Sequence, residues 1–296
     1  MNTSRRDFLR YSAMLGAGVI LRPFNSFEIA GEAAKFLERI GLCTGISNNG
    51  VLANAGYSYV EEAVRNFLVP AEDETAFQAK LALLKESKLP VEACNNFIAG
   101  NLKSVGPAAV HDDILKFVEV AFQRAKMAGV KTIVFGSGGS RSIPDGFSRD
   151  QAREQFISLC KKMAPIAGKY DVVISLEPLN SGECNFINSV AEGGEIVKAV
   201  KHNNFLLLAD LYHMLREKES PEDIVKYGDL LYHTHIAENK DRAAPGVNKE
   251  DFTPFFKALK KADYKGRMSV ECNKINLAEQ AAPALLEMRR QLAIIG

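Results

Sequence analysis

Eight short apolar runs recur along the chain, and each is followed by a stretch with helical periodicity. Several runs are nearly continuous in apolar residues, as expected for parallel strands that are covered on both faces. Strands that alternate with helices form βαβ units and a parallel sheet. This alternation constrains the fold more than any other feature. The runs are residues 40–45, 58–62, 91–98, 132–137, 172–177, 205–210, 231–236 and 267–272.

The segments between the runs carry matching helix signals. An apolar stripe with i, i+3, i+4, i+7 spacing covers residues 114–125. Cap patterns predict helix starts at Ser148, Ser189, Ser220 and Thr253.

Eight strand and helix units in about 265 residues predict a single-domain (β/α)₈ barrel, an α/β fold. An open doubly wound sheet is the alternative. The glycine-rich sequence at 136–140 follows the fourth run rather than the first, which gives little support to a Rossmann or P-loop nucleotide site.

The first 30 residues do not fit the barrel pattern. Arg5 and Arg6 are followed by Phe8-Leu9 and then by a mostly apolar stretch over residues 11–21. A basic start before a short apolar run is typical of an export signal, and this one resembles a twin-arginine (Tat) signal. An ordinary amphipathic first helix is the alternative. We therefore expect residues 1–30 to be a Tat signal segment and residues 31–296 to be the catalytic barrel. The Tat machinery would be a partner, and the protein would be periplasmic, either soluble or anchored by an uncleaved signal.

Composition excludes several other classes. The 296-residue chain has a formal net charge of +1, which argues against a general nucleic-acid binder. Its five cysteines are odd in number and contain no C-x-x-C pair, so they do not form a disulfide framework. No seam for a homo-oligomer is visible, and association is left open.

Charged or imidazole side chains stand at or near the carboxyl ends of the last four apolar runs. Glu177, Asp210, His235 and Glu271 stand at or near the carboxyl ends of four consecutive predicted strands, where barrel enzymes carry their chemistry. Carboxylates are costly to bury there unless they are paired or coordinated. Three oxygen donors and one imidazole suit one divalent ion such as Mn²⁺, Mg²⁺ or Co²⁺, while Zn²⁺ would usually recruit more nitrogen or sulfur. For any one of these residues, an ion pair is the alternative. We expect His233 to support the site or to pack.

At these residues the sequence resembles the xylose isomerase-like barrel superfamily, and specifically its ketose 3-epimerases and hydroxypyruvate isomerases. The matching motifs are Glu177-x-x-Asn-x-x-Glu183, Asp210-x-x-His213, His235 followed by Arg242 and Pro245-Gly246, and Glu271. One extra residue separates His235 from Arg242 relative to the family pattern.

The resemblance implies a division of roles among these residues. Glu177, Asp210, His235 and Glu271 would bind the metal, and Glu183, His213 and Arg242 would bind the sugar.

The expected chemistry follows from the metal and the carboxylates. A divalent ion polarises the sugar carbonyl, and a carboxylate removes the neighbouring proton to give a metal-stabilised enediolate. Glu177 and Glu271 are the predicted catalytic carboxylates of a sugar isomerase or epimerase acting on a non-phosphorylated small-molecule sugar. A lyase or hydratase acting on keto-sugars or 3-keto-glycosides is the main alternative. A metal-dependent hydrolase resembling endonuclease IV and a non-catalytic sugar-binding barrel are lesser ones.

Overall fold

Eight parallel strands pair in sequence order, and β8 pairs with β1 to close a barrel. The computed structural model describes residues 39–273 and 276–295. Every predicted run contains a strand, which confirms the (β/α)₈ barrel and excludes the open sheet. The predicted export segment, residues 1–30, lies outside the described residues. The strands are β1 (Ile40–Cys43), β2 (Tyr59–Ala63), β3 (Val91–Asn95), β4 (Thr132–Phe135), β5 (Val173–Leu176), β6 (Phe205–Asp210), β7 (Leu231–Ile236) and β8 (Arg267–Val270).

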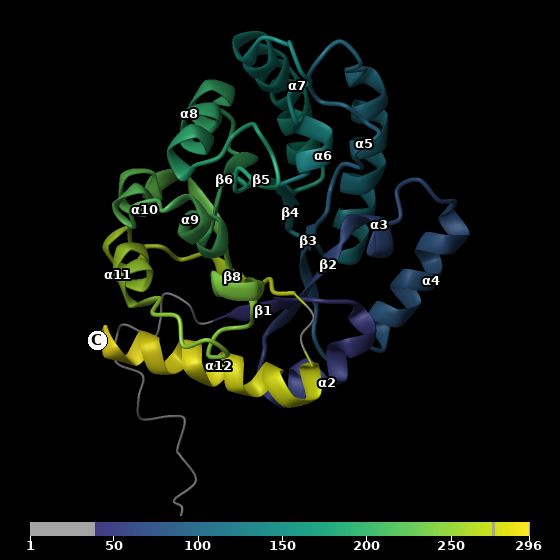
Figure 1. The fold of residues 1–296 in the computed structure, drawn as a ribbon. Coiled ribbons are helices and arrows are strands. Elements are labelled where there is room, and N and C mark those ends of the chain that lie inside the picture. Colours follow the sequence, from purple (N-terminus) through teal and green to yellow (C-terminus); the bar gives the residue numbers. More distant parts are fainter. Residues whose placement is uncertain (1–38, 274–275, 296) are drawn as a thin grey trace, which may run out of the picture.

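Helices surround the strands on the outside of the barrel (Figure 1). Among the described residues, no helix is both long and apolar enough to span a membrane. The α-helices are α2 (Asn49–Ala55), α3 (Val64–Phe67), α4 (Glu74–Lys85), α5 (His111–Ala128), α6 (Gly138–Arg141), α7 (Arg149–Lys169), α8 (Val190–Val200), α9 (Leu211–Glu217), α10 (Glu222–Lys226), α11 (Thr253–Lys261) and α12 (Leu277–Ile294). Short 3₁₀ turns are η2 (Ile46–Asn48), η3 (Gly228–Leu230) and η4 (Lys240–Arg242).

Two of the predicted caps begin long helices as expected. The Ser148 side chain accepts a hydrogen bond from the backbone N–H of Gln151 at the start of α7. Ser189 does the same for Glu192 at the start of α8. A side-chain acceptor at this position satisfies an amide that has no partner within the helix.

The predicted cap at Thr253 is wrong by one position. Thr253 is already the first residue of α11, and Phe252 is its cap residue. The reason is that Asp251 supplies the side-chain acceptor instead, because its Oδ1 accepts a hydrogen bond from the Thr253 N–H at 3.0 Å. The predicted cap at Ser220 is also displaced by one position, because Pro221 is the cap residue of α10. Ser220 Oγ nevertheless accepts a hydrogen bond from Glu222 N, the first residue of the helix, at 3.2 Å.

The apolar core lies between the strands and the helix ring. The stripe of α5 faces it through Ile114, Val118, Ala121, Phe122 and Ala125, all fully buried. A chain of ring contacts continues from α5 to the β5–α8 loop, through Phe122, Phe97, Phe135, Phe156 and Phe186.

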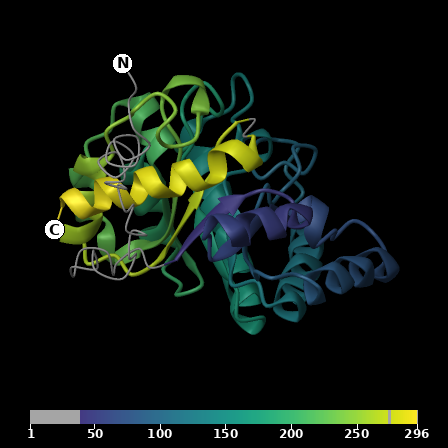
Figure 2. The same cartoon turned by 90° about the horizontal axis from the view of Figure 1, so that it is seen from below.

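The beginning and the end of the barrel are joined on its outer side. Figure 2 shows α12 running beside α2. The Tyr57 hydroxyl donates a hydrogen bond to the carbonyl of Ala281 in α12 at 3.0 Å. The last helix therefore covers the seam at which β8 meets β1.

Two buried arginines hold loops by their backbone carbonyls. Arg141, in the turn after β4, is fully buried and donates to the carbonyls of Phe135, Phe186 and Ile187. This fixes the loop that follows β5. Arg124 of α5 holds the segment after α3 in the same way, through the carbonyls of Leu68, Val69, Glu72 and Asp73.

Candidate metal centre and active site

The structure brings all four predicted metal-binding residues together at one end of the barrel. Glu177 directly follows β5, Asp210 ends β6, His235 lies in β7 and Glu271 directly follows β8. One donor atom from each lies within 4.8 Å of the others. Glu177, Asp210 and His235 are buried, and Glu271 is partly buried.

Unpartnered polar atoms in this cluster fit a divalent cation. Asp210 caps α9 through Oδ1, which accepts a hydrogen bond from Tyr212 N at 2.8 Å. Its other oxygen, Oδ2, is buried and accepts no hydrogen bond among the described residues, although the Arg242 guanidinium lies 3.5 Å and His213 Nε2 lies 3.4 Å away. A buried carboxylate oxygen without a donor is costly, and coordination removes that cost. The set of three carboxylates and one imidazole therefore fits a divalent ion.

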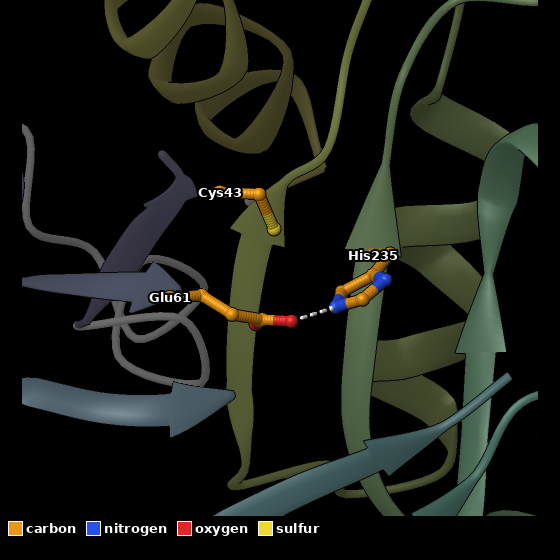
Figure 3. Close-up of side chains that lie close together, drawn as sticks. All are labelled: Cys43, Glu61 and His235. Atoms are coloured by element: carbon orange, nitrogen blue, oxygen red, sulfur yellow. Dashed lines mark hydrogen bonds and ion pairs between the residues drawn. The ribbon is translucent and has the colours of Figure 1, made fainter. Parts of the chain in front are cut away.

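His235 connects the cluster to a deeper layer of the barrel. Its Nδ1 lies 3.0 Å from Glu177 Oε1 and 3.2 Å from Glu271 Oε2. Its Nε2 lies 2.9 Å from Glu61 Oε1, on the opposite side of the ring (Figure 3). The imidazole thus presents one nitrogen to the cluster and the other to the barrel interior.

The surrounding charges shift the pKa values of these groups in opposite directions. Burial raises the pKa of Asp210 to about 6, against the lowering effect of Arg242 and His235. Burial also raises the pKa of Glu177. For Glu271, burial is outweighed by His235 and Arg242, and the pKa falls to about 2. Burial alone would lower the pKa of His235, but the carboxylates of Glu61, Glu271 and Glu177 raise it well above its usual range.

Arg242 reaches the cluster despite the extra residue that precedes it. Its guanidinium forms ion pairs with Glu271 at 2.5 Å, Asp210 at 3.5 Å and Glu183 at 3.6 Å. The backbone at Asp241 and Arg242 has φ values of 62° and 48°. Non-glycine residues in this left-handed region store strain, which is typical of functional sites. With these two consecutive left-handed residues, the guanidinium of Arg242 lies against Glu271.

His213 and Glu183 belong to one hydrogen-bonded group with Asn180. The Nδ1 atom of His213 accepts from the backbone N–H of Asn180 at 3.2 Å, and Asn180 Nδ2 donates to Glu183 Oε1 at 2.8 Å. His213 Nε2 is buried and makes no hydrogen bond among the described residues, and it lies 3.4 Å from Asp210 Oδ2. Burial lowers the pKa of His213, and the nearby Arg242 charge adds to that effect. A neutral ring with an unpaired Nε2–H suits a substrate oxygen.

The three predicted substrate-binding residues and two of the metal-binding residues line one cavity of about 270 Å³. The rest of its wall comes mainly from the first half of the barrel, through Asn95, Asn96 and the glycine-rich residues 136–139. The predicted residues therefore lie together, while their individual roles stay predictions.

Sequence reasoning missed three residues that support the cluster from β2, β3 and the end of β4. Glu61 is completely buried and contacts His235. Asn95 donates a hydrogen bond to Glu271 Oε1 at 2.9 Å. Gly136 leaves room for Glu177, because a Cβ atom there would lie 2.2 Å from Glu177 Oε2. The available signal was a polar residue inside an apolar run, as at Glu61 and Asn95.

His233 takes the supporting position expected for it. Its ring is buried and lies edge-on to that of His235, with centroids 5.2 Å apart. Its Nε2 lies 2.9 Å from Glu61 Oε2 and thus faces away from the metal cluster. It is absent from the group of four converging donors.

Comparison with known proteins gives a family assignment. Residues 50–292 match the family described as xylose isomerase-like TIM barrel. The chain belongs to this family. The xylose isomerase-like chain is 30% identical over 226 residues to L-ribulose 3-epimerase from Methylomonas sp. (strain DH-1), covering 74% of this chain and 75% of the relative. It is 26% identical over 157 residues to hydroxypyruvate isomerase from Escherichia coli (strain K12), covering 52% and 60%.

Solved structures show the same xylose isomerase-like fold. The structure of 3-keto-D-glucoside 4-epimerase from E. coli superposes with a TM-score of 0.71 at 22% identity, covering 85% of this chain and 99% of that one. At this identity the likeness concerns the fold. The sequence relatives are sugar epimerases and isomerases, which confirms the resemblance at the level of the family.

Proposed function

We propose that this protein is a divalent-metal-dependent sugar epimerase or isomerase acting on non-phosphorylated sugars. The observation that carries the proposal is the convergence of four donor atoms, one each from Glu177, Asp210, His235 and Glu271, at the edge of a polar cavity. Membership of a family that contains sugar epimerases and isomerases supports it.

Residues of the cavity would have different roles in such a reaction. A divalent ion held by Glu177, Asp210, His235 and Glu271 would polarise the carbonyl of the sugar as a Lewis acid. One of the two carboxylates, Glu177 or Glu271, removes the proton from the adjacent carbon. The other returns a proton to the opposite face, which epimerises that carbon. Return to the neighbouring carbon interconverts aldose and ketose.

The charges in the cavity favour a substrate without a phosphate group. Arg242 is already paired with Glu271, Asp210 and Glu183. A phosphate would have to compete with three carboxylates for that guanidinium, whereas sugar hydroxyls can accept from it without a second negative charge. His213 Nε2 offers a further donor. Two substrate types are therefore worth testing, namely free ketoses and keto-glycosides, on which the relatives act by name.

Exchange with heavy water tests the proposal. The purified protein is supplied with Mn²⁺ and incubated in D₂O with ketoses, aldoses and 3-keto-glycosides. We expect one deuterium to enter a recovered sugar whose mass is otherwise unchanged, and we expect a chelator to stop the exchange. Gain or loss of water would instead indicate a hydratase or lyase. Sugar binding with no exchange on any substrate would indicate a non-catalytic sugar-binding barrel.

We also propose that the protein is exported through the Tat pathway to the periplasm. The support is the sequence of residues 4–21, in which Arg5-Arg6 precede a short apolar stretch. Replacing both arginines with lysine should keep the protein in the cytoplasm, as measured by cell fractionation. Unchanged periplasmic recovery of the Lys–Lys variant would contradict this assignment.

A further inference from the structure

A carboxylate is completely buried beneath the four-residue metal cluster, outside the set of converging donors. Glu61 of β2 is 0% exposed. Its Oε1 lies 2.9 Å from His235 Nε2, and its Oε2 lies 2.9 Å from His233 Nε2. Ser269 of β8 donates to the same Oε2 at 2.6 Å. A single side chain thus ties together three strands of the barrel.

These contacts determine which nitrogen of His235 can bind a metal. An ionised carboxylate only accepts hydrogen bonds, so Nε2 must carry the hydrogen in both His235 and His233. Nδ1 is then the only ring atom of His235 that can give a lone pair to a metal ion, and it can do so once the ion displaces the proton that Nδ1 shares with Glu177 and Glu271 in the metal-free protein. The same tautomer in His233 leaves an unpaired acceptor at Nδ1, and that atom has no hydrogen-bond partner among the described residues.

Glu61 belongs to a longer chain of hydrogen bonds in the barrel interior. The Tyr59 hydroxyl lies 2.9 Å from Ser269 Oγ, so a chain of hydrogen bonds runs from Tyr59 through Ser269 to Glu61. The Tyr59 ring fits because Gly41 faces it, since a Cβ atom on Gly41 would lie 2.2 Å from the ring. Residues of four strands, β1, β2, β7 and β8, therefore hold Glu61 in one place.

We propose that Glu61 is a positioning residue that fixes His235 with Nδ1 as its metal-binding atom and strengthens that bond through its negative charge. The proposal rests on the metal centre of the proposed function. Carboxylates that accept from the second nitrogen of a ligating histidine fix its tautomer and ring orientation and raise its basicity. In this protein one carboxylate serves the ligand His235 and the non-ligand His233 together.

Cys43 allows a competing arrangement to be tested. Figure 3 shows its side chain near the contact between Glu61 and His235, and the three residues offer donor atoms within 4.8 Å of one another. An ion held there would take the Nε2 atom of His235 away from Glu61. The two arrangements differ in the number of ions bound per protein molecule. The first binds one ion, with Glu61 holding His235 from behind, and the second binds two ions that share His235.

Metal titration of variants separates these arrangements. Mn²⁺ binding to chelator-treated protein is measured by calorimetry for the wild type, Glu61→Gln and Glu62→Gln. Glutamine has one acceptor oxygen and cannot accept from both histidines, so Glu61→Gln should weaken Mn²⁺ binding by about 10–100-fold. Glu62 is the matched control, because it is the next residue of β2, also buried, but bonded to Ile46 N at 2.7 Å. We expect Glu62→Gln to change the affinity for Mn²⁺ by less than about 3-fold, because the Glu62 carboxylate bonds to Ile46 N and does not support a metal-binding histidine.

Two further measurements keep the proposal falsifiable. Nitrogen NMR of the Zn²⁺-loaded protein should show Nε2–H in both His235 and His233, which can be resolved because the chain has five histidines. Where Glu61→Gln fails to fold, Ser269→Ala keeps the Glu61 carboxylate but removes the 2.6 Å bond to Oε2 together with the contact to the Tyr59 hydroxyl. This variant should weaken Mn²⁺ binding by less than about 10-fold, below the loss expected from the carboxylate itself.

Three results would overturn the proposal. They are wild-type Mn²⁺ affinity in Glu61→Gln, a His235 that carries its hydrogen on Nδ1, or binding of two ions of which Cys43→Ser loses one. A wild-type protein that binds no divalent ion overturns the metal centre and this proposal together. A protein that binds one ion and depends on Glu61, yet exchanges no deuterium into any sugar, overturns only the proposed function.

Discussion

The two halves of the barrel contribute different things to the candidate site. Each strand from β5 to β8 ends at or near one of the four converging donors. The strands from β1 to β4 supply none of these four. They provide Glu61 and Asn95, which contact the donors, and Gly136, which leaves space for Glu177. The second half thus presents the four converging donors, and the first half supplies side chains and space that fit around them.

The largest effect is expected from the carboxylates of the second half. Glu177→Gln and Glu271→Gln should each lower turnover by about 10³-fold, because each removes a proton-transfer group. Initial rates of deuterium incorporation measure this loss, and circular dichroism checks that the fold is kept. Asn95→Ala, in the first half, should cost only about 10-fold, as expected for a supporting hydrogen bond. Equal losses from Asn95→Ala and Glu271→Gln would remove the distinction between the halves.

The two buried arginines provide the next comparison. Arg124→Met and Arg141→Met should each lower the free energy of unfolding by about 2–3 kcal/mol, because each leaves buried carbonyls without donors. Urea denaturation measures this. Only Arg141 holds the loop after β5, which carries Asn180 and Glu183. We therefore expect a raised KM for the sugar in Arg141→Met alone, and the same rise in both variants would contradict this assignment.

A substitution in the glycine-rich loop sharpens the role of the first half. Gly136→Ala should displace the Glu177 carboxylate, whose Oε2 would lie 2.2 Å from the new Cβ atom. We expect Mn²⁺ affinity to fall about 10-fold, or 1.4 kcal/mol, with little change in Tm because a flexible side chain can move aside. Gly139→Ala is the control in the same loop, since its nearest contact is 3.4 Å. Similar affinity losses in both variants would mean that the whole loop, and not the Glu177 position, had changed.

The smallest effect concerns a partly buried acid of the second half that is not one of the donors. Burial raises the pKa of Glu219 from 4.5 to about 7, although its carboxylate accepts from Val190 N at 2.7 Å. Between these values the folded protein binds more protons than the unfolded chain, so this group makes stability fall as pH rises from 4.5 to 7.

Glu219→Gln keeps an acceptor for Val190 and removes the titration. The variant should be more stable than the wild type at pH 8, by about 1 kcal/mol after allowance for solvent screening. Urea denaturation from pH 4 to pH 8 measures the difference, and the two proteins should be similar at pH 4. If the free energies of unfolding of the two proteins differ by the same amount at every pH from 4 to 8, titration of Glu219 does not affect stability.

The sequence predicted the second half of the site better than the first for a physical reason. Glu177, Asp210 and Glu271 each stand at the end of an apolar run. Because the carboxyl ends of all barrel strands lie at the same end of the barrel, these side chains could be predicted to lie close together. Glu61 lies within its run, and its contact with His235 spans 174 residues of sequence. Nothing in the local pattern of residues 58–62 identifies that partner. The fold was predictable in the same way, because the eight apolar runs are local signals. The start of α11 was missed by one position because it depends on a single hydrogen bond to the Asp251 side chain.

Barrel closure has a consequence for how such a site is assembled. Glu271 directly follows β8, and β8 is the strand that pairs with β1. A chain still emerging from the ribosome carries Glu177, Asp210 and His235 before it carries Glu271, so the four donors meet only after β8 has been synthesised and has paired with β1. An ion bound at the proposed metal centre would therefore be held by all four donors only in molecules whose barrel has closed.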